Sequence, residues 1–224
     1  MKRAVLAVGG WAHPGDDIAR AASALVEAAG FVSATVRDPG VLAQTLSQGC
    51  DLLVVGACWF AMNDARYTEP QRADHAFEAD ATLLAELEVL RTTGCPLLAL
   101  HTAVISFDGA EVWREWLGGT WNWETSWHPE PAPMLVQPPG SASIALGTFE
   151  PFTVTDELYQ DLTIDATARI EAESAGGQPL AWTVESSLGR SAVSLLGHDA
   201  RSLQTPGHQE LLGDLLAWLL AERD

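Results

Sequence analysis

Short apolar runs alternate with helix-like patterns along the first half of the chain, and this alternation restricts the fold more than any other feature. The runs at residues 4–8, 31–37, 51–57 and 96–100 have the length and Val/Leu content of buried strands. Residues 16–29 place their apolar side chains at helical spacing, with a glycine directly after them. This order is typical of βαβ units, whose parallel strands form a sheet covered on both faces. We therefore expect an α/β protein with a mainly parallel central sheet.

The second half of the chain is less regular. Further strands are predicted near 152–155, 168–174, 179–185 and 190–196, and a helix follows with six leucines on one face, namely Leu211, Leu212, Leu215, Leu216, Leu219 and Leu220. Two stretches show no clear period: the polar residues 60–79, and residues 118–147, which are rich in Trp, Pro, Gly and Ser. We interpret both as long loops, the second shaped around its tryptophans. Since no repeat is visible, we expect a single domain over residues 1–224.

Charge and cysteine content exclude several classes of partner. The chain has 12 Lys and Arg against 30 Asp and Glu, a formal net charge of −18, so it should repel nucleic acids and anionic membrane surfaces. The apolar run at 4–8 is too short for a signal core, and no run approaches the ~20 apolar residues of a membrane span. Three scattered cysteines argue against a disulfide framework. We expect a cytoplasmic protein, and exposed apolar surface in the Trp-rich segment would suit a homo-oligomer.

Three of the predicted strands end in a histidine. The strand at 4–8 leads to His13, the strand at 96–100 leads directly to His101, and the strand at 190–196 leads to His198 and then Asp199. Ligands of open parallel sheets bind beyond the carboxyl ends of the strands. We therefore expect these rings to emerge on one edge of the sheet, with His128 of the Trp-rich segment folding over them.

Each of these residues also has a purely structural interpretation. His13 precedes a proline and can be a turn residue, and His198 with Asp199 can cap a helix. His101, at a helix start, should have a neutral ring suited to ligation or proton transfer. We take His101 and His198 as catalytic candidates, with Asp199 orienting His198.

Two other histidines, His75 and His208, lie among polar residues, and we expect them to be solvated. Cys58 at the end of the strand at 51–57 is a candidate nucleophile, although an isolated cysteine between Ala57 and Trp59 is more typical of core packing.

No local metal-binding or nucleotide-binding motif is present. The chain lacks H-x-x-x-H, H-x-H and C-x-x-C, so a divalent metal such as zinc would need distant ligands, for which the candidates are His13, His101, His128 and His198. The glycines match neither G-x-G-x-x-G nor the P-loop, and no nucleotide cofactor is expected.

Nine tryptophans are many for 224 residues. Five of them gather at predicted strand ends or in the Trp-rich segment: Trp11, Trp59, Trp121, Trp123 and Trp127. Their flat faces suit the C–H faces of a sugar ring, but they can equally fill space between layers. As substrate-binding candidates we take Trp11, Trp59 and Trp123, together with His13 and His128.

Several separately spaced motifs resemble the trehalose-utilisation (ThuA-like) family. They are GCPLLALHTAVISFDGAEVWREWLGGTWNWETSWHP, FTVTDELY, PLAWTVE and LLGHDARSL, followed by a Leu-rich helix that ends in Ala-Trp. The resemblance implies a class I glutamine amidotransferase-like fold, which is a flavodoxin-like three-layer sandwich. In that superfamily the turn after the central strand carries a nucleophilic cysteine, and the matching position here is His101. A thioester route to glutamine hydrolysis would therefore lack its nucleophile, and we expect no glutaminase activity.

The resemblance also implies a role in the metabolism of trehalose or a related disaccharide or keto-sugar. We expect a small carbohydrate ligand and a histidine-based site. Two classes of function remain open at this stage: a hydrolase, lyase or isomerase acting on a small carbohydrate, and a non-catalytic sugar-binding or regulatory protein on the same fold.

Overall fold

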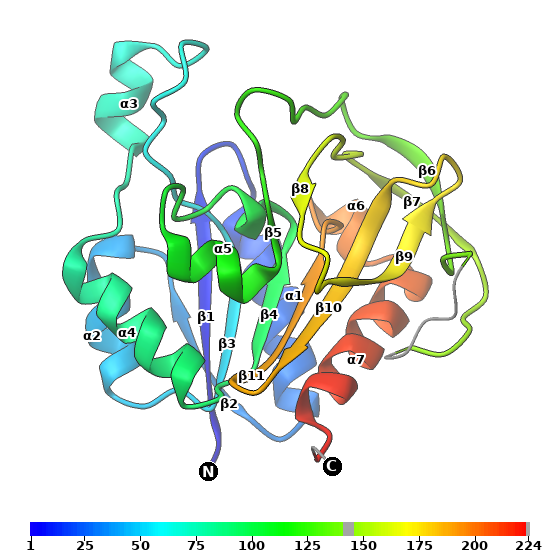
Figure 1. Cartoon of the computed structure of the whole chain (residues 1–224), viewed down its shortest axis with the longest axis horizontal. Helices are drawn as coiled ribbons and strands as arrows, with labels where there is room; N and C mark the ends of the chain where they lie inside the picture. The colour runs from blue at the N-terminus through cyan, green and yellow to red at the C-terminus, as the bar shows by residue number, and fades with distance from the viewer. Residues whose placement is uncertain (141–145, 223–224) are drawn as a thin grey trace.

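The computed structural model describes residues 1–140 and 146–222, and a mixed sheet of nine strands in the order β2-β1-β3-β4-β11-β10-β9-β6-β7 forms its centre (Figure 1). Five neighbouring strands are parallel: β2 (Val32–Val36), β1 (Arg3–Gly10), β3 (Leu52–Cys58), β4 (Leu97–Leu100) and β11 (Gly189–Ser194). Four antiparallel strands extend this half: β10 (Pro179–Ser186), β9 (Arg169–Ser174), β6 (Ala132–Gln137) and β7 (Phe152–Asp156). A separate pair, β5 (Gly119–Thr120) and β8 (Thr163–Ile164), lies beside them.

Helices cover both faces of the sheet. On one face lie α1 (Gly15–Ala28), α6 (Ala200–Leu203) and α7 (Pro206–Leu220), and on the other lie α2 (Leu42–Ser47), α4 (Ala81–Thr92) and α5 (Glu111–Leu117). Two 3₁₀ turns, η1 (Pro39–Val41) and η2 (His101–Val104), complete the layers. The expected three-layer α/β sandwich is confirmed, with the antiparallel strands as an addition to it.

Strand β1 shows why the central parallel strands β1, β3 and β4 have long buried apolar runs. Leu6 and Val8 pack with α1 and α7 in one core cluster, whereas Val5 and Ala7 pack with α2 and α4 in the other. Because successive side chains of a strand point to opposite faces, a strand between two helical layers has no polar face.

The structure corrects two expectations about loops. The polar stretch 60–79 contains α3 (Glu69–His75), which stands away from the sheet (Figure 1). Its start is stabilised by Gln71, whose Oε1 accepts from the backbone N–H of Thr68 at 2.7 Å. The Trp-rich stretch contains β6, which pairs with β7 and β9 and so belongs to the antiparallel extension. Part of that stretch, residues 141–145, lies outside the described residues.

The expectation of a solvated His208 is wrong. Its side chain is fully buried on α7, in phase with Leu211, Leu212 and Leu215, and its Nδ1 lies 3.0 Å from Ser202 Oγ. His75, by contrast, is exposed at the end of α3.

None of the described helices combines the length and the apolar character needed to cross a membrane.

Candidate functional site

The carboxyl ends of β1, β4 and β11 bring three histidines together. The ring of His13 lies 5.0 Å from that of His101 and 5.0 Å from that of His198, and the rings of His101 and His198 are 5.4 Å apart. All three strands are parallel, so their carboxyl ends lie at the same edge of the sheet. The convergence expected from the strand ends is therefore present in the structure.

The turn after β4 fixes the ring of His101. Its backbone has φ +46°, a left-handed conformation unusual for a residue with a side chain, and the residue is fully buried. Its Nδ1 lies 2.7 Å from the carbonyl oxygen of Leu195 on the chain leaving β11. A carbonyl can only accept, so Nδ1 donates to it, and in the neutral ring the lone pair then lies on Nε2.

A glycine-rich turn after β1 fixes His13 in the same manner. Gly10 has φ +101°, and a Cβ on it would lie 2.3 Å from the carbonyl oxygen of Cys58, so only glycine fits here. The His13 Nδ1 lies 2.8 Å from the carbonyl oxygen of Trp11 and must donate to it. Its Nε2 is buried and has no hydrogen-bond partner among the described residues.

A carboxylate that the sequence analysis did not select completes the cluster. Glu157 follows β7, and its Oε2 lies 3.3 Å from His101 Nε2 while its Oε1 lies 3.4 Å from His198 Nδ1. Neither contact has hydrogen-bonding geometry, and both Glu157 Oε2 and His198 Nδ1 are buried without a partner among the described residues. The FTVTDELY motif contains the signal, since it places two carboxylates directly after a strand.

The three histidines and Glu157 have the donor atoms to hold one metal ion together. His13, His101, Glu157 and His198 each offer one ligand atom, and these atoms lie within 4.8 Å of one another. Bonds of about 2.0–2.1 Å to zinc in tetrahedral geometry separate neighbouring ligand atoms by roughly 3.3–3.4 Å, close to the 3.3 Å between Glu157 Oε2 and His101 Nε2. The carbonyls that hold the outer nitrogens of His13 and His101 are the usual partners of metal-bound histidines. The residues therefore fit a divalent cation such as zinc.

Electrostatics favour the metal-binding forms of His13 and Glu157. Burial lowers the pKa of His13 to about 3, and the neighbouring His101 ring contributes to the shift, so His13 is neutral near pH 7. Burial alone would raise the pKa of Glu157, but the nearby imidazoles of His101 and His198 outweigh burial and hold the pKa below its usual range. The contact with Glu157 in turn raises the pKa of His198. A carboxylate and neutral imidazoles are the forms that bind metals, so a metal would have to displace the proton that the contact with Glu157 favours on His198.

Two further groups border the cluster. The buried Tyr159 hydroxyl lies 3.3 Å from His101 Nε2 and donates to it. His128 reaches the cluster from the Trp-rich segment, with its Nδ1 3.5 Å from Glu157 Oε1, and 37% of its side chain is exposed. His128 thus lies between the buried carboxylate and solvent, and its ring packs against Trp121 and Tyr159.

Some predicted residues have other surroundings. The carboxylate of Asp199 binds Arg201 at 2.6 Å and accepts from the Arg201 backbone N–H, so it caps α6 and is engaged away from the His198 ring. Trp59 is buried against Phe77 and Phe107 in the core, which leaves no face for a ligand.

Trp11 and Trp123 remain partly exposed. The ring of Tyr67 links them, at 6.1 Å from Trp11 and 6.2 Å from Trp123. The buried thiol of Cys58 is a poor nucleophile, because burial and the charge of Glu157 raise its pKa far above the usual range.

Comparison with known proteins decides the family. The sequence profile described as ThuA, trehalose utilisation, matches residues 4–219. The chain belongs to the ThuA family. No curated protein matches the sequence.

Solved structures share the fold of this ThuA-family chain. A ThuA-like protein from Parabacteroides merdae has a TM-score of 0.74 at 15% identity, with 97% of this chain and 89% of that chain covered. A second, from Bacteroides uniformis, has a TM-score of 0.65 at 13% identity, with 98% and 91% covered. A glutamine amidotransferase from Methylobacillus flagellatus has a TM-score of 0.52 at 15% identity, with 93% and 72% covered. The resemblance to amidotransferases is thus confirmed for the fold.

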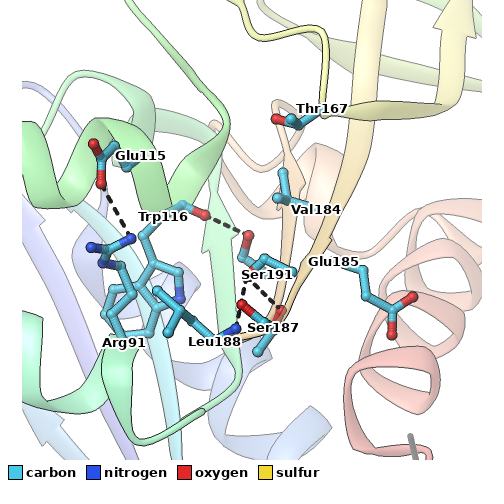
Figure 2. A pocket seen from close by; sticks show the side chains of 11 residues that line it. Arg91, Glu115, Trp116, Thr167, Val184, Glu185, Ser187, Leu188 and Ser191 are labelled. Carbon is cyan, nitrogen blue, oxygen red and sulfur yellow. Dashed lines mark hydrogen bonds and ion pairs between the residues drawn. The ribbon is translucent and has the colours of Figure 1, made fainter. Parts of the chain in front are cut away.

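A separate hollow lies at the opposite end of the parallel strands (Figure 2). It has a volume of about 220 Å³ and lies between α4, α5 and the β10–β11 hairpin. Its polar groups bind one another: Arg91 pairs with Glu88 and Glu115, and the Ser191 hydroxyl donates to the carbonyl of Trp116. Because these groups are already paired, the hollow offers a ligand less than the histidine cluster does.

Proposed function

We propose that this ThuA-family protein is an enzyme of trehalose or related disaccharide or keto-sugar metabolism, with a divalent metal such as zinc held by His13, His101, Glu157 and His198. One observation carries the proposal. Three of the four candidate ligand atoms, on His13, Glu157 and His198, are buried without a partner among the described residues and face one another. Burying a polar atom without a partner costs about 1–3 kcal/mol, so a bound cation would compensate a considerable cost.

A metal at this position would act as a Lewis acid toward an oxygen of the substrate. The remaining roles belong to the protein. His13 and His101 are held by the carbonyls of Trp11 and Leu195, which keeps their inner nitrogens aimed at the centre. The Tyr159 hydroxyl can bind a substrate oxygen beside His101, and His128 can exchange protons with solvent. A small sugar that has a carbonyl group, or a C–H made acidic by a neighbouring carbonyl, fits these roles.

The proposal includes the absence of glutaminase activity. The side chain at the turn after β4 is an imidazole, and the thiol of Cys58 is buried. Neither provides the thiolate that a thioester intermediate requires.

The test combines metal analysis with substrate screening on protein purified without an affinity tag. We expect about one equivalent of divalent metal per chain, and hydrolysis, elimination or isomerisation of a keto-disaccharide that is lost on chelation. His13→Ala should lose metal and activity together, whereas His75→Ala, which removes an exposed histidine outside the candidate ligand set, should retain the metal; its ring contacts Trp11, so activity is not its control readout. A wild-type protein with neither metal nor turnover under these conditions would overturn the proposal.

A sugar-binding protein without catalysis is the second candidate, and the aromatic rings beside the cluster favour it. Tyr67 contacts Trp11 and Trp123, and Phe60 stacks on Trp123 at 5.4 Å. Such rings bind sugars without any chemistry. If His101→Ala and His198→Ala keep their affinity for the sugar and no reaction is found in the wild type, the binding function is correct.

A further inference from the structure

Beneath the cluster lies a second, deeper carboxylate that the proposed chemistry does not use. Asp156 is the last residue of β7 and only 1% exposed. Among the described residues, no Lys or Arg forms an ion pair with it, and its one acid–base contact is His101 Nδ1 at 3.9 Å. A buried carboxylate without a cation is costly unless it is well hydrogen-bonded.

Backbone N–H groups supply those hydrogen bonds, and they come from both sides of the cluster. Asp156 Oδ2 accepts from Gly197 at 2.7 Å, and Oδ1 accepts from Glu157 at 2.8 Å and from His198 at 3.4 Å. Two of these donors belong to candidate ligand residues. The third, Gly197, has φ +125°, a conformation that turns the chain from β11 toward His198 and favours glycine.

These hydrogen bonds join the ends of β7 and β11, two strands that are not neighbours in the sheet. β7 is the outer strand of the antiparallel extension, whereas β11 belongs to the parallel half. We propose that Asp156 is a positioning residue, whose buried carboxylate ties the turn after β11 to the end of β7 and so holds His198 and Glu157 at a common centre. The inference rests on the proposed function for its consequence in metal binding, but the tie itself can be tested without metal.

The substitution Asp156→Asn isolates this role, because it keeps the shape and removes one acceptor. Both carboxylate oxygens accept backbone N–H groups. An amide has one oxygen and one NH₂, so at least one backbone donor would face another donor. Substitutions of groups that orient metal ligands typically weaken metal binding 10–100-fold.

A suitable control disturbs the same extension without touching the cluster. Thr183 on β10 is 2% exposed, and its hydroxyl donates to Glu171 at 2.7 Å. Thr183→Val removes this buried hydrogen bond and shows what a general loss of stability does to the readouts.

Two measurements on the full chain test the inference. In zinc and cobalt titrations, we expect Asp156→Asn to bind zinc about 10–100-fold more weakly and to change the visible spectrum of bound Co²⁺, with Thr183→Val within about threefold of wild type. In crystal structures without metal, the 3.4 Å separation between His198 Nδ1 and Glu157 Oε1 should lengthen in Asp156→Asn alone.

The outcomes separate this inference from the proposed function. A wild type that binds no metal overturns the metal centre, and the crystallographic separation then still decides the role of Asp156. An unchanged separation, or unchanged zinc affinity in a wild type that does bind metal, overturns the positioning role. Should Asp156→Asn not fold, Asp156→Glu keeps the charge, displaces it by one methylene, and is measured in the same two ways with the same expected direction.

Discussion

Zinc should stabilise this protein through the buried atoms of the cluster. The Nε2 of His13, the Nδ1 of His198 and the Oε2 of Glu157 have no hydrogen-bond partner among the described residues. At about 1–3 kcal/mol for each such atom, the cluster costs the fold roughly 3–9 kcal/mol when nothing binds there. A cation that contacts all of them recovers part of this cost only in the native state.

The size of the effect follows from linkage between binding and folding. Zinc at 100 times its Kd adds about 2.7 kcal/mol to the free energy of unfolding. For a domain of this length, each kcal/mol raises Tm by about 2–4 °C, so Tm should rise by roughly 5–11 °C. The assay is differential scanning fluorimetry of chelator-treated protein over a series of zinc concentrations. Mg²⁺ is the control ion, because it prefers oxygen ligands to imidazole nitrogens.

Two variants show whether the stabilisation arises at the cluster. His13→Ala removes one ligand atom and should reduce the zinc-induced shift to less than half. His75→Ala removes an exposed histidine that contacts Trp11 and lies outside the candidate ligand set, and it should leave the shift unchanged. An equal shift in His13→Ala and wild type would refute the reasoning, as would a wild type whose Tm does not respond to zinc.

Three further predictions concern Gly10, His13 and the pair of cysteines Cys50 and Cys58. In urea unfolding, Gly10→Ala should lower the free energy of unfolding by about 3 kcal/mol or more, because its Cβ would meet the Cys58 carbonyl. Gly9→Ala, which has φ +97° but open space around it, should lower it by only about 1–2 kcal/mol. Similar losses in the two variants would contradict the close approach at Gly10. The folded-state pKa of His13 is about 3, below its unfolded value of 6.5, so this group lowers the stability of the metal-free protein as pH falls from about 6.5 toward 3. His13→Gln should therefore flatten the pH dependence of the free energy of unfolding in that window. An unchanged slope would count against a buried neutral ring. Under native conditions Ellman's reagent should modify the half-buried Cys50 and leave Cys58 unmodified, and rapid labelling of Cys58 would show that this region opens.

The centre of the parallel half was predictable from the sequence because β1, β3 and β4 are buried on both faces over most of their length. Continuous apolar runs such as 51–57 have no other common explanation when helical patterns lie between them. The antiparallel extension was harder, since β6 is half-exposed and lies within a segment dominated by Trp and Pro. His208 was misjudged from its polar neighbours, although it lies three, four and seven residues before the leucines that form the buried face of α7.

The candidate site was predictable only where it follows parallel strands. His13, His101 and His198 share one edge of the sheet because β1, β4 and β11 run in the same direction. Glu157 reaches the same edge from β7, the outer strand of the sheet, and no periodicity in the sequence reveals that return path.

Sequence proximity was misleading for Asp199. It directly follows His198, yet its carboxylate caps α6 through Arg201. The carboxylates that do contact the cluster are Asp156 and Glu157, about forty residues earlier in the chain. Adjacent residues at a helix start point in different directions, so the neighbour in sequence is a weak candidate for the neighbour in space.

His101 shows how the turn after β4 can serve different chemistry on one fold. The turn after β4 holds the buried side chain of His101 at φ +46°. The resemblance seen in the sequence implies a nucleophilic cysteine at this turn in amidotransferases. A cysteine there needs a single reactive atom, whereas an imidazole has two nitrogens, and the chain uses the outer one to bind the Leu195 carbonyl. The inner nitrogen then faces Glu157, a group that would raise the pKa of a thiol and suppress its reactivity. The carboxylate that makes this position unfavourable for a thiolate makes it favourable for a cation, and for this reason we infer that His101 acts as a ligand in place of a nucleophile.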